Sequence, residues 1–204
     1  MEVQSRIVEG ATELFFRYGL KSITMDDIAK HLGVSKKTIY QFFSDKNQLV
    51  CEVTRNYLSY SEKSFEDISE KSMDPVDEIL KISEHVKVMF QNMNPSVLYE
   101  AQKYYPQAYA IFMEHKESCI RCSLMKNLEQ GIELGLYRKD IDLNIISKLR
   151  LEQVQMAFNP LIFPSPEYDL AQVQVQFIDH YLHGICTLKG HKLINQYKHI
   201  SEEE

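Results

Sequence analysis

The sequence has few of the residues that mark several common classes of protein. Its four cysteines are too few and too scattered in 204 residues to form a disulfide framework, so we expect free thiols. No apolar run approaches the roughly 18 residues that a membrane span needs. The first residues, MEVQSRIVEG, lack the apolar core of a signal peptide. These absences favour a soluble, cytoplasmic protein.

Signatures of enzymes are also missing. The chain contains no glycine-rich phosphate loop, no HExxH and no GxSxG. Paired acids such as Asp26 and Asp27 are typical of a helix N-terminus, where carboxylates oppose the positive end of the helix dipole. We therefore expect no catalytic residue and no cofactor.

One possible metal site depends on helical spacing. His115, Cys119 and Cys122 are four and three residues apart, so a continuous α-helix would place them on one face. An imidazole and two thiolates could bind a soft metal such as zinc. Because structural zinc sites normally use turns, an ordinary helical face is the favoured interpretation.

The charge is unevenly distributed along the chain. Residues 1–55 hold eight of the 23 basic and seven of the 29 acidic residues, so their net charge is +1 while the whole chain carries −6. A near-neutral N-terminal segment followed by an acidic remainder indicates two modules with different partners. We place the modules at residues 1–46 and 47–204.

The spacing of apolar residues is helical almost throughout, and no stretch alternates with a period of two. The sequence therefore predicts an all-α protein of nine to ten helices. Glycine, proline and capping residues delimit them at about 4–18, 25–32 after Thr24, 35–43, 46–70 after Ser44 or Asp45, from Asp74-Pro75, from Asn94-Pro95, 106–135, from Asp142 to Phe158, 168–188, and after Gly190.

The second and third predicted helices form a helix-turn-helix. Ala29 provides the small residue where the helices touch, Gly33 the left-handed turn, and Ile39 the buried apolar residue of the second helix. Ser35 would cap this second helix, so Lys36 and Lys37 fall in its first turn. Cations there oppose the helix dipole unless an external anion, such as a DNA phosphate, lies nearby.

Residues 3–50 resemble the N-terminal DNA-binding domain of the TetR family of bacterial transcriptional regulators. The stretches ATELFFRYGL and ITMDDIAKHLGVSKKTIYQFFSDKNQL carry the resemblance. It implies a homodimer that places two recognition helices one DNA turn apart, about 34–36 Å. Together with the first-turn argument, it identifies the DNA-binding residues as Thr24, Ser35, Lys36, Lys37, Thr38, Tyr40, Gln41 and Lys46.

The remainder resembles the family in outline, as a helical regulatory domain that binds a small, largely apolar or aromatic effector and dimerises. A tyrosine-rich segment could line the effector cavity, although plain core packing is the favoured interpretation for any one of its residues: Tyr99, Tyr105, Tyr109, Phe112 and Met113. The helices at about 143–158 and 168–188 are expected to pair with their copies in a second chain as a four-helix bundle. The second of them carries an apolar seam suited to this pairing, and packing within the monomer is the alternative: Leu170, Val173, Phe177, Tyr181, Ile185 and Leu188.

The sequence thus predicts a ligand-responsive transcriptional repressor that binds operator DNA and is released by its effector. The helix at about 46–70 begins beside the recognition helix, so we expect it to transmit effector binding. The alternatives are a helical interaction or scaffold protein with a purely structural helix-turn-helix, and an all-α enzyme using the tyrosine-rich cavity.

Overall fold

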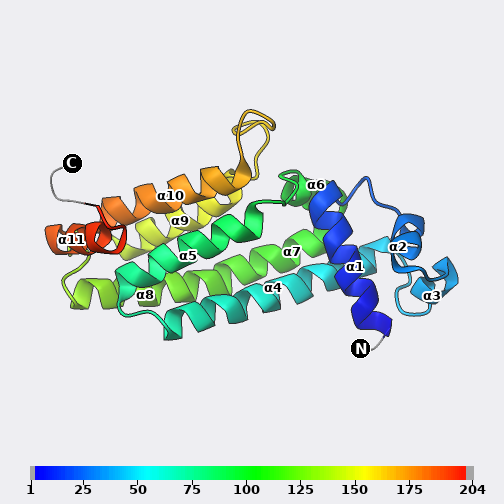
Figure 1. Cartoon of the computed structure of the whole chain (residues 1–204), viewed down its shortest axis with the longest axis horizontal. Coiled ribbons are helices and arrows are strands. Elements are labelled where there is room, and N and C mark those ends of the chain that lie inside the picture. Colours follow the sequence, from blue (N-terminus) through cyan, green and yellow to red (C-terminus); the bar gives the residue numbers. More distant parts are fainter. Residues whose placement is uncertain (1–2, 201–204) are drawn as a thin grey trace. The chain divides into compact units, whose positions relative to one another are not determined.

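The computed structural model describes residues 3–200, which fold almost entirely into helices (Figure 1). The all-α prediction is confirmed. No helix within this described range is long and apolar enough to cross a membrane. The elements are α1 (Val3–Tyr18), α2 (Met25–Leu32), α3 (Lys36–Tyr40), α4 (Lys46–Glu70), α5 (Pro75–Phe90), α6 (Val97–Tyr104), α7 (Pro106–His115), the π-helical segment η1 (Lys116–Ile120), α8 (Arg121–Glu133), α9 (Leu143–Met156), α10 (Leu170–Ile185) and α11 (Leu188–Tyr197).

Most helix starts follow from local hydrogen bonding. Thr24 and Asp27 form a capping box, in which the Asp27 backbone N–H donates to Thr24 Oγ1 at 3.2 Å. Asp74 accepts from two backbone N–H groups in the first turn of α5, and Pro75 occupies its first position. Asp142 caps α9 in the same way. These caps confirm starts that the sequence predicted.

Several helix boundaries differ from the prediction. Helix α6 begins at Val97 after Ser96, beyond the start expected at Asn94-Pro95. The helix expected over 106–135 is interrupted by η1, because a π-helical turn inserts extra residues into the α-helical spacing. Helix α3 ends at Tyr40 instead of near Phe43. Helix α11 starts at Leu188 after the cap Thr187, so Gly190 lies inside this helix and does not precede it.

The chain divides into two compact units, in so far as its residues are described. Unit 1 comprises residues 1–62, 92–115 and 158–167, and unit 2 comprises residues 63–91, 116–157 and 168–204. Unit 1 therefore contains the predicted DNA-binding domain together with α6 and α7. Helix α4 contributes residues to both units.

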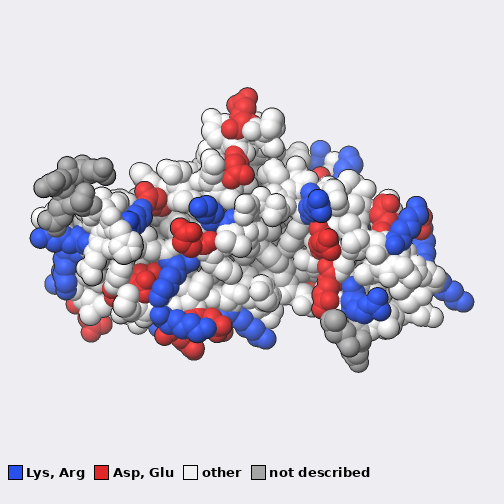
Figure 2. Space-filling view, in the orientation of Figure 1, with Lys and Arg blue, Asp and Glu red and all other residues white. Residues whose placement is uncertain are grey.

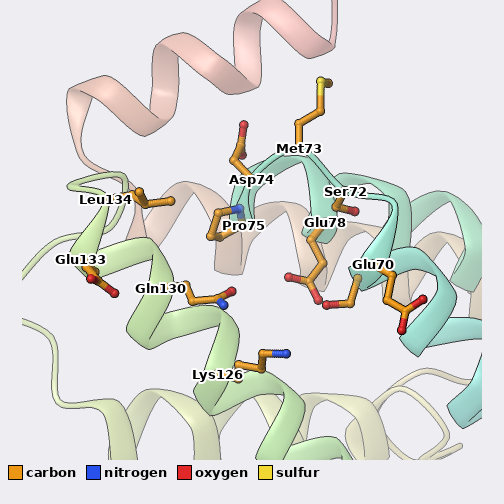
Figure 3. A pocket seen from close by; sticks show the side chains of 11 residues that line it. Glu70, Ser72, Met73, Asp74, Pro75, Glu78, Lys126, Gln130, Glu133 and Leu134 are labelled. Atoms are coloured by element: carbon orange, nitrogen blue, oxygen red, sulfur yellow. The ribbon is translucent and has the colours of Figure 1, made fainter.

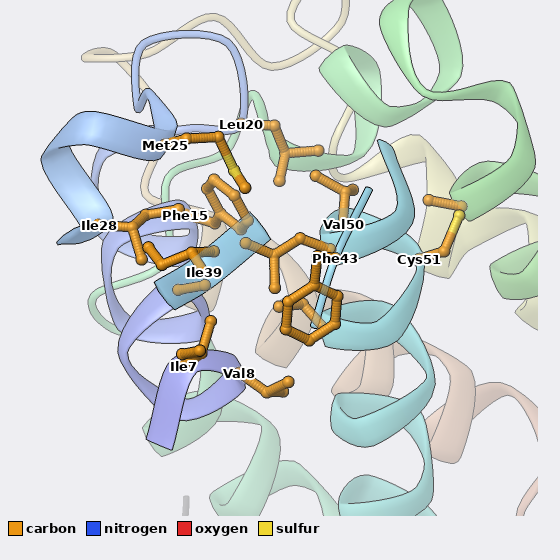
Figure 4. Close-up of a cluster of buried hydrophobic side chains, with 14 of the residues drawn as sticks. Ile7, Val8, Phe15, Leu20, Met25, Ile28, Ile39, Phe43, Val50 and Cys51 are labelled. Carbon is orange, nitrogen blue, oxygen red and sulfur yellow. The ribbon is translucent and has the colours of Figure 1, made fainter. Parts of the chain in front are cut away.

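The core of unit 1 packs the helix-turn-helix against α1 and α4 (Figure 4). Phe15 of α1, Ile28 of α2 and Ile39 of α3 are fully shielded from solvent. Phe43 and Leu49 extend the same cluster to the start of α4. Each of these buried side chains stabilises the fold by about 1.5–3 kcal/mol relative to leaving it exposed. Unit 1 therefore has a hydrophobic core of its own.

In unit 2, α5 packs against α8, α10 and α11, and α9 packs against α8, α10 and η1. A buried polar network links these helices. The Asn127 side-chain amide donates to the Pro75 carbonyl oxygen at 3.1 Å and to Glu78 Oε2 at 2.7 Å. Tyr137 Oη lies 2.8 Å from the same carbonyl oxygen. These hydrogen bonds satisfy buried groups that would otherwise destabilise the fold.

Candidate functional site

The helix-turn-helix has the geometry that its sequence predicts. Gly33 adopts a left-handed conformation with φ 66°, which a residue with a Cβ atom rarely adopts. The Val34 backbone N–H donates to the Ala29 carbonyl oxygen at 3.0 Å and closes the turn. Ala29 is 5% exposed and Ile39 is fully buried, so α2 and α3 are held together at a fixed angle.

The outward face of α3 is polar and accessible. Ser35 caps the helix, and its Oγ accepts from the Thr38 backbone N–H at 3.1 Å. Tyr40 is 44% exposed, and Gln41 is exposed beside it. In Figure 2, basic side chains project from the surface where Figure 1 places α2 and α3, with acidic side chains beside them.

The two lysines that begin α3 differ in their surroundings. Lys36 Nζ lies 3.2 Å from Asp26 Oδ1, so an ion pair joins α3 to α2. Lys37 is exposed, and its ammonium group makes no ion pair or hydrogen bond within residues 3–200. Of the two, Lys37 is therefore the cation with no competing partner in the protein.

Lys46 lies in a different setting. Its ammonium group donates to the Leu20 carbonyl oxygen and lies 5.6 Å from the ring centroid of Phe15 and 5.4 Å from that of Tyr105. Burial lowers the pKa of the Lys46 ammonium group, and the nearby Glu100 and Asp27 carboxylates partly oppose this shift. Lys46 thus links the start of α4 to the loop after α1, and a phosphate would have to share its remaining N–H groups.

Further hydrogen bonds attach α1 to the segment that begins α6. The Asn94 backbone N–H donates to the Phe16 carbonyl oxygen at 2.6 Å. Glu100 Oε2 accepts from the Lys21 backbone N–H at 2.7 Å. Gly19, with φ 90°, allows the chain to turn between these two contacts. Helix α6 and the segment before it are therefore held to α1 and to the loop that precedes the helix-turn-helix.

The tyrosine-rich segment is distributed over several environments. Tyr99 is 41% exposed, and the Lys103 ammonium group lies 5.8 Å from its ring centroid. Tyr105 and Tyr109 are half-buried and pack against the core of unit 1. The Tyr109 and Phe112 rings lie 6.4 Å apart, and Met113 is half-buried. Tyr105 and Tyr109 thus contribute to the packing around the helix-turn-helix, and a role in effector binding stays a prediction.

A pocket of about 470 Å³ lies within unit 2, between the end of α4, the start of α5 and α8 (Figure 3). Its lining is mainly polar, with the carboxylates of Glu70, Glu78 and Glu133 and the ammonium group of Lys126. Glu78 is already bound by the Asn127 amide. Such a lining does not suit a largely apolar effector.

The predicted dimer seam on α10 faces inward. Four of its six residues are at most 8% exposed in the single chain: Leu170, Val173, Tyr181 and Ile185. Leu188 is 84% exposed but belongs to α11. Phe177 is half-buried. The seam is therefore mostly core packing of the monomer, because a helical apolar stripe does not reveal which neighbour covers it.

On α9, in contrast, apolar side chains face solvent. Ile145 is 65% exposed and Leu149 is 51% exposed. Because they are four residues apart, they form one stripe on the helix surface. The sequence predicted that this helix takes part in the dimer but did not single out these two residues, because its apolar residues could equally have been core.

The residues of the possible metal site are separated by η1. His115 ends α7, Cys119 lies in η1 and Cys122 lies in α8, so the α-helical spacing that grouped them is altered. Neither cysteine forms a disulfide; Cys119 is half-buried and Cys122 is exposed.

A left-handed glycine turn that presents an accessible polar helix is the geometry of a helix-turn-helix unit. Residues 7–53 match the family model described as bacterial regulatory proteins, tetR family. The predicted resemblance to the TetR family is therefore confirmed over residues 7–53.

Similarity to characterised proteins extends beyond this domain. The HTH-type transcriptional repressor KstR2 of Mycobacterium tuberculosis is 26% identical over 151 residues, covering 71% of this chain and 76% of KstR2. A TetR-family regulator from Agrobacterium tumefaciens has the same fold, with a TM-score of 0.75, 17% identity, and coverage of 90% of this chain and 97% of that one. The regulator FadR of Bacillus subtilis, solved with stearoyl-CoA, gives a TM-score of 0.64 at 17% identity over 89% of this chain and 98% of FadR.

Proposed function

We propose that the protein is a transcriptional repressor that binds operator DNA as a homodimer and is released by a small-molecule effector. The observation that carries the proposal is the accessible face of α3, which follows the Gly33 turn. On this face the Lys37 ammonium group has no partner among the described residues. Because bacterial operator DNA lies in the cytoplasm, the protein would act there.

The DNA interface follows from this face. Lys37 would contact a phosphate, and the exposed Tyr40 and Gln41 would contact the DNA backbone or a base edge. Thr24, at the start of α2, and the residues of the first turn of α3 would position the recognition helix: Ser35, Lys36 and Thr38. Lys46 would act mainly by holding α4 against the helix-turn-helix.

Effector control would pass through α4. This helix begins beside the recognition helix and contributes residues to unit 2. An effector in the regulatory body releases DNA only if it binds two arrangements of this helix unequally. A typical coupling of 1–3 kcal/mol lowers operator affinity about 5- to 150-fold, and DNA then weakens effector binding by the same factor.

Similarity suggests the chemistry of the effector. FadR of Bacillus subtilis was solved with stearoyl-CoA, an acyl compound with a long apolar chain. By analogy, a largely apolar small molecule fits an all-helical regulatory body whose interior is apolar.

Selection of bound fragments from the source genome tests the proposal and yields the operator. We expect the affinity for the selected fragment to fall steeply as salt rises, because phosphate contacts release counterions. Tyr40→Phe should cost roughly 1–2 kcal/mol of operator affinity if its hydroxyl binds a phosphate. Tyr60→Phe is the matched control, since Tyr60 is 69% exposed on α4.

Binding that selects no sequence, or that does not depend on salt, would contradict the proposal. A structural helix-turn-helix in an interaction protein would then be the better explanation. Turnover of a bound small molecule would instead indicate an enzyme.

A further inference from the structure

Three buried polar atoms on α9 and α10 have no hydrogen-bond partner among the described residues. They are Arg150 Nη1, Gln153 Oε1 and Tyr181 Oη. A fourth such atom, Tyr57 Oη, lies in unit 1 and is separate from this group. Unpaired buried polar groups are rare in folded proteins, because each loses its hydrogen bonds to water without replacement.

The surrounding packing does satisfy other buried polar groups. Lys116 is fully buried, and its ammonium group lies 3.2 Å from Glu152 Oε1 and 3.0 Å from Gln155 Oε1. Gln174 is 1% exposed, and its amide donates to the Val154 carbonyl oxygen at 2.9 Å. The three unpaired atoms are therefore exceptions in a unit that pairs these other buried polar groups.

The charge of Arg150 is also unopposed. Burial lowers the pKa of its guanidinium group to about 10, while the Tyr181 hydroxyl acts in the opposite direction. The group is still charged at neutral pH. No carboxylate of residues 3–200 makes an ion pair with it, and Glu152, two residues along α9, is bound by Lys116 and Lys148.

Arg150 lies on α9 and Tyr181 on α10, two helices that pack against each other. Both present hydrogen-bond donors, since a guanidinium group donates only and a phenol donates its proton. Apolar residues adjoin them along the two helices, including the fully buried Leu151 and Leu182. Two buried donors without an acceptor, on packed helices with apolar neighbours, fit an oxyanion attached to an apolar body.

We propose that Arg150 and Tyr181 form a subsite for an oxyanion, such as a carboxylate, carried by an otherwise apolar effector. The Arg150 guanidinium group would donate to the oxyanion through Nη1, and Tyr181 Oη would donate a second hydrogen bond. This inference rests on the proposed function, because it assumes that unit 2 binds the effector. It narrows the effector class from apolar molecules in general to amphipathic acids.

The test compares acids with neutral molecules of the same chain length. Octanoate, dodecanoate and octadecanoate, the corresponding alcohols, and the corresponding alkyl phosphates are titrated calorimetrically into the full-length protein. We expect at least one acid to bind about tenfold or more tightly than its alcohol, and Arg150→Met to abolish that preference. The phosphate arm distinguishes a carboxylate from a phosphate as the source of the oxyanion.

Arg138→Met is the matched control, since Arg138 is an exposed arginine of the same unit. This variant should retain the preference for the acid. Equal binding of acids and alcohols to the unchanged protein, or an undiminished preference in Arg150→Met, would overturn the subsite.

Thermal unfolding without ligand gives a second readout. Because the Arg150 side chain has no partner among residues 3–200, Arg150→Met should raise the Tm by about 2–4 °C, whereas removing a paired arginine would lower it. A lower Tm for Arg150→Met would mean that the guanidinium group is satisfied within the fold and would overturn the proposal.

Operator binding separates this inference from the proposed function. Ligand-free Arg150→Met should bind operator as the unchanged protein does. If the unchanged protein binds no DNA but still prefers the acid, the subsite stands and the repressor function fails. If the unchanged protein binds operator DNA but prefers no acid, the repressor function stands and the subsite fails.

Discussion

At the scale of single residues, the structure separates two lysines that the sequence placed together as DNA contacts. Lys37 is exposed and unpaired among the described residues, so its charge is available to a phosphate. The ammonium group of Lys46 is bound to the Leu20 carbonyl oxygen and lies against two aromatic rings. Sequence alone could not separate them, because both fall in the first turn of a predicted helix.

We predict different effects for the two lysines. Lys46→Met should lower the free energy of unfolding by roughly 1–2 kcal/mol, since it removes a charge-assisted hydrogen bond and cation–π contacts. Lys37→Met should leave stability unchanged and reduce the salt slope of operator binding by about one unit. Urea unfolding and fluorescence anisotropy measure the two effects. A reduced salt slope with unchanged stability in Lys46→Met would restore Lys46 as a phosphate contact.

At the scale of elements, glycine permits one close approach that no propensity rule predicts. After α8, Gly135 adopts φ 68° and the chain turns back on the helix. The Tyr137 ring then lies so close to Gly131 that a Cβ atom there would be 2.0 Å from a ring carbon. Tyr137 is fully buried and hydrogen-bonded at its hydroxyl, so its ring cannot move aside cheaply.

Gly131→Ala should therefore destabilise the protein by about 1–3 kcal/mol or more through overpacking. Gly184→Ala is the matched control, because Gly184 is also helical and nothing lies within 4 Å of its Cβ position. This change should stabilise the protein by roughly 0.5–1 kcal/mol through the helix propensity of alanine. Chemical denaturation of both variants measures the contrast, and equal effects would show that the tyrosine ring is free to move.

At the scale of the whole molecule, the proposed dimer depends on which apolar surface the fold leaves uncovered. The α10 seam predicted from the sequence is largely buried within the chain. The α9 stripe of Ile145 and Leu149 faces solvent instead. We infer that α9 contributes the apolar surface that a second copy would cover.

The double variant Ile145→Asp/Leu149→Asp should convert a dimer into a monomer at micromolar concentration, because charges are costly in an apolar interface. Val88→Asp should remain dimeric, since Val88 is 71% exposed on α5, outside the proposed interface. Sedimentation velocity distinguishes these outcomes. A monomeric unchanged protein would contradict both the dimer and an operator with two half-sites.

The all-α class, the helix-turn-helix and most helix starts could be predicted from the sequence alone. These features depend on residues close together in the chain: Thr24 with Asp27, Gly33 in its turn, and Asp74 beside Pro75. A cap or a left-handed turn is a local interaction, so its residue types predict it directly.

Three features depend on tertiary packing: which apolar faces are covered, where the Lys46 ammonium group is bound, and the interruption of a predicted helix by η1. So does the burial of Arg150 Nη1 without a hydrogen-bond partner among the described residues. Each of these depends on which distant segments pack together, and a helix that is apolar on one side is compatible with many neighbours. Residues 26 or more positions apart, such as Leu20 and Lys46, meet only after the chain has folded.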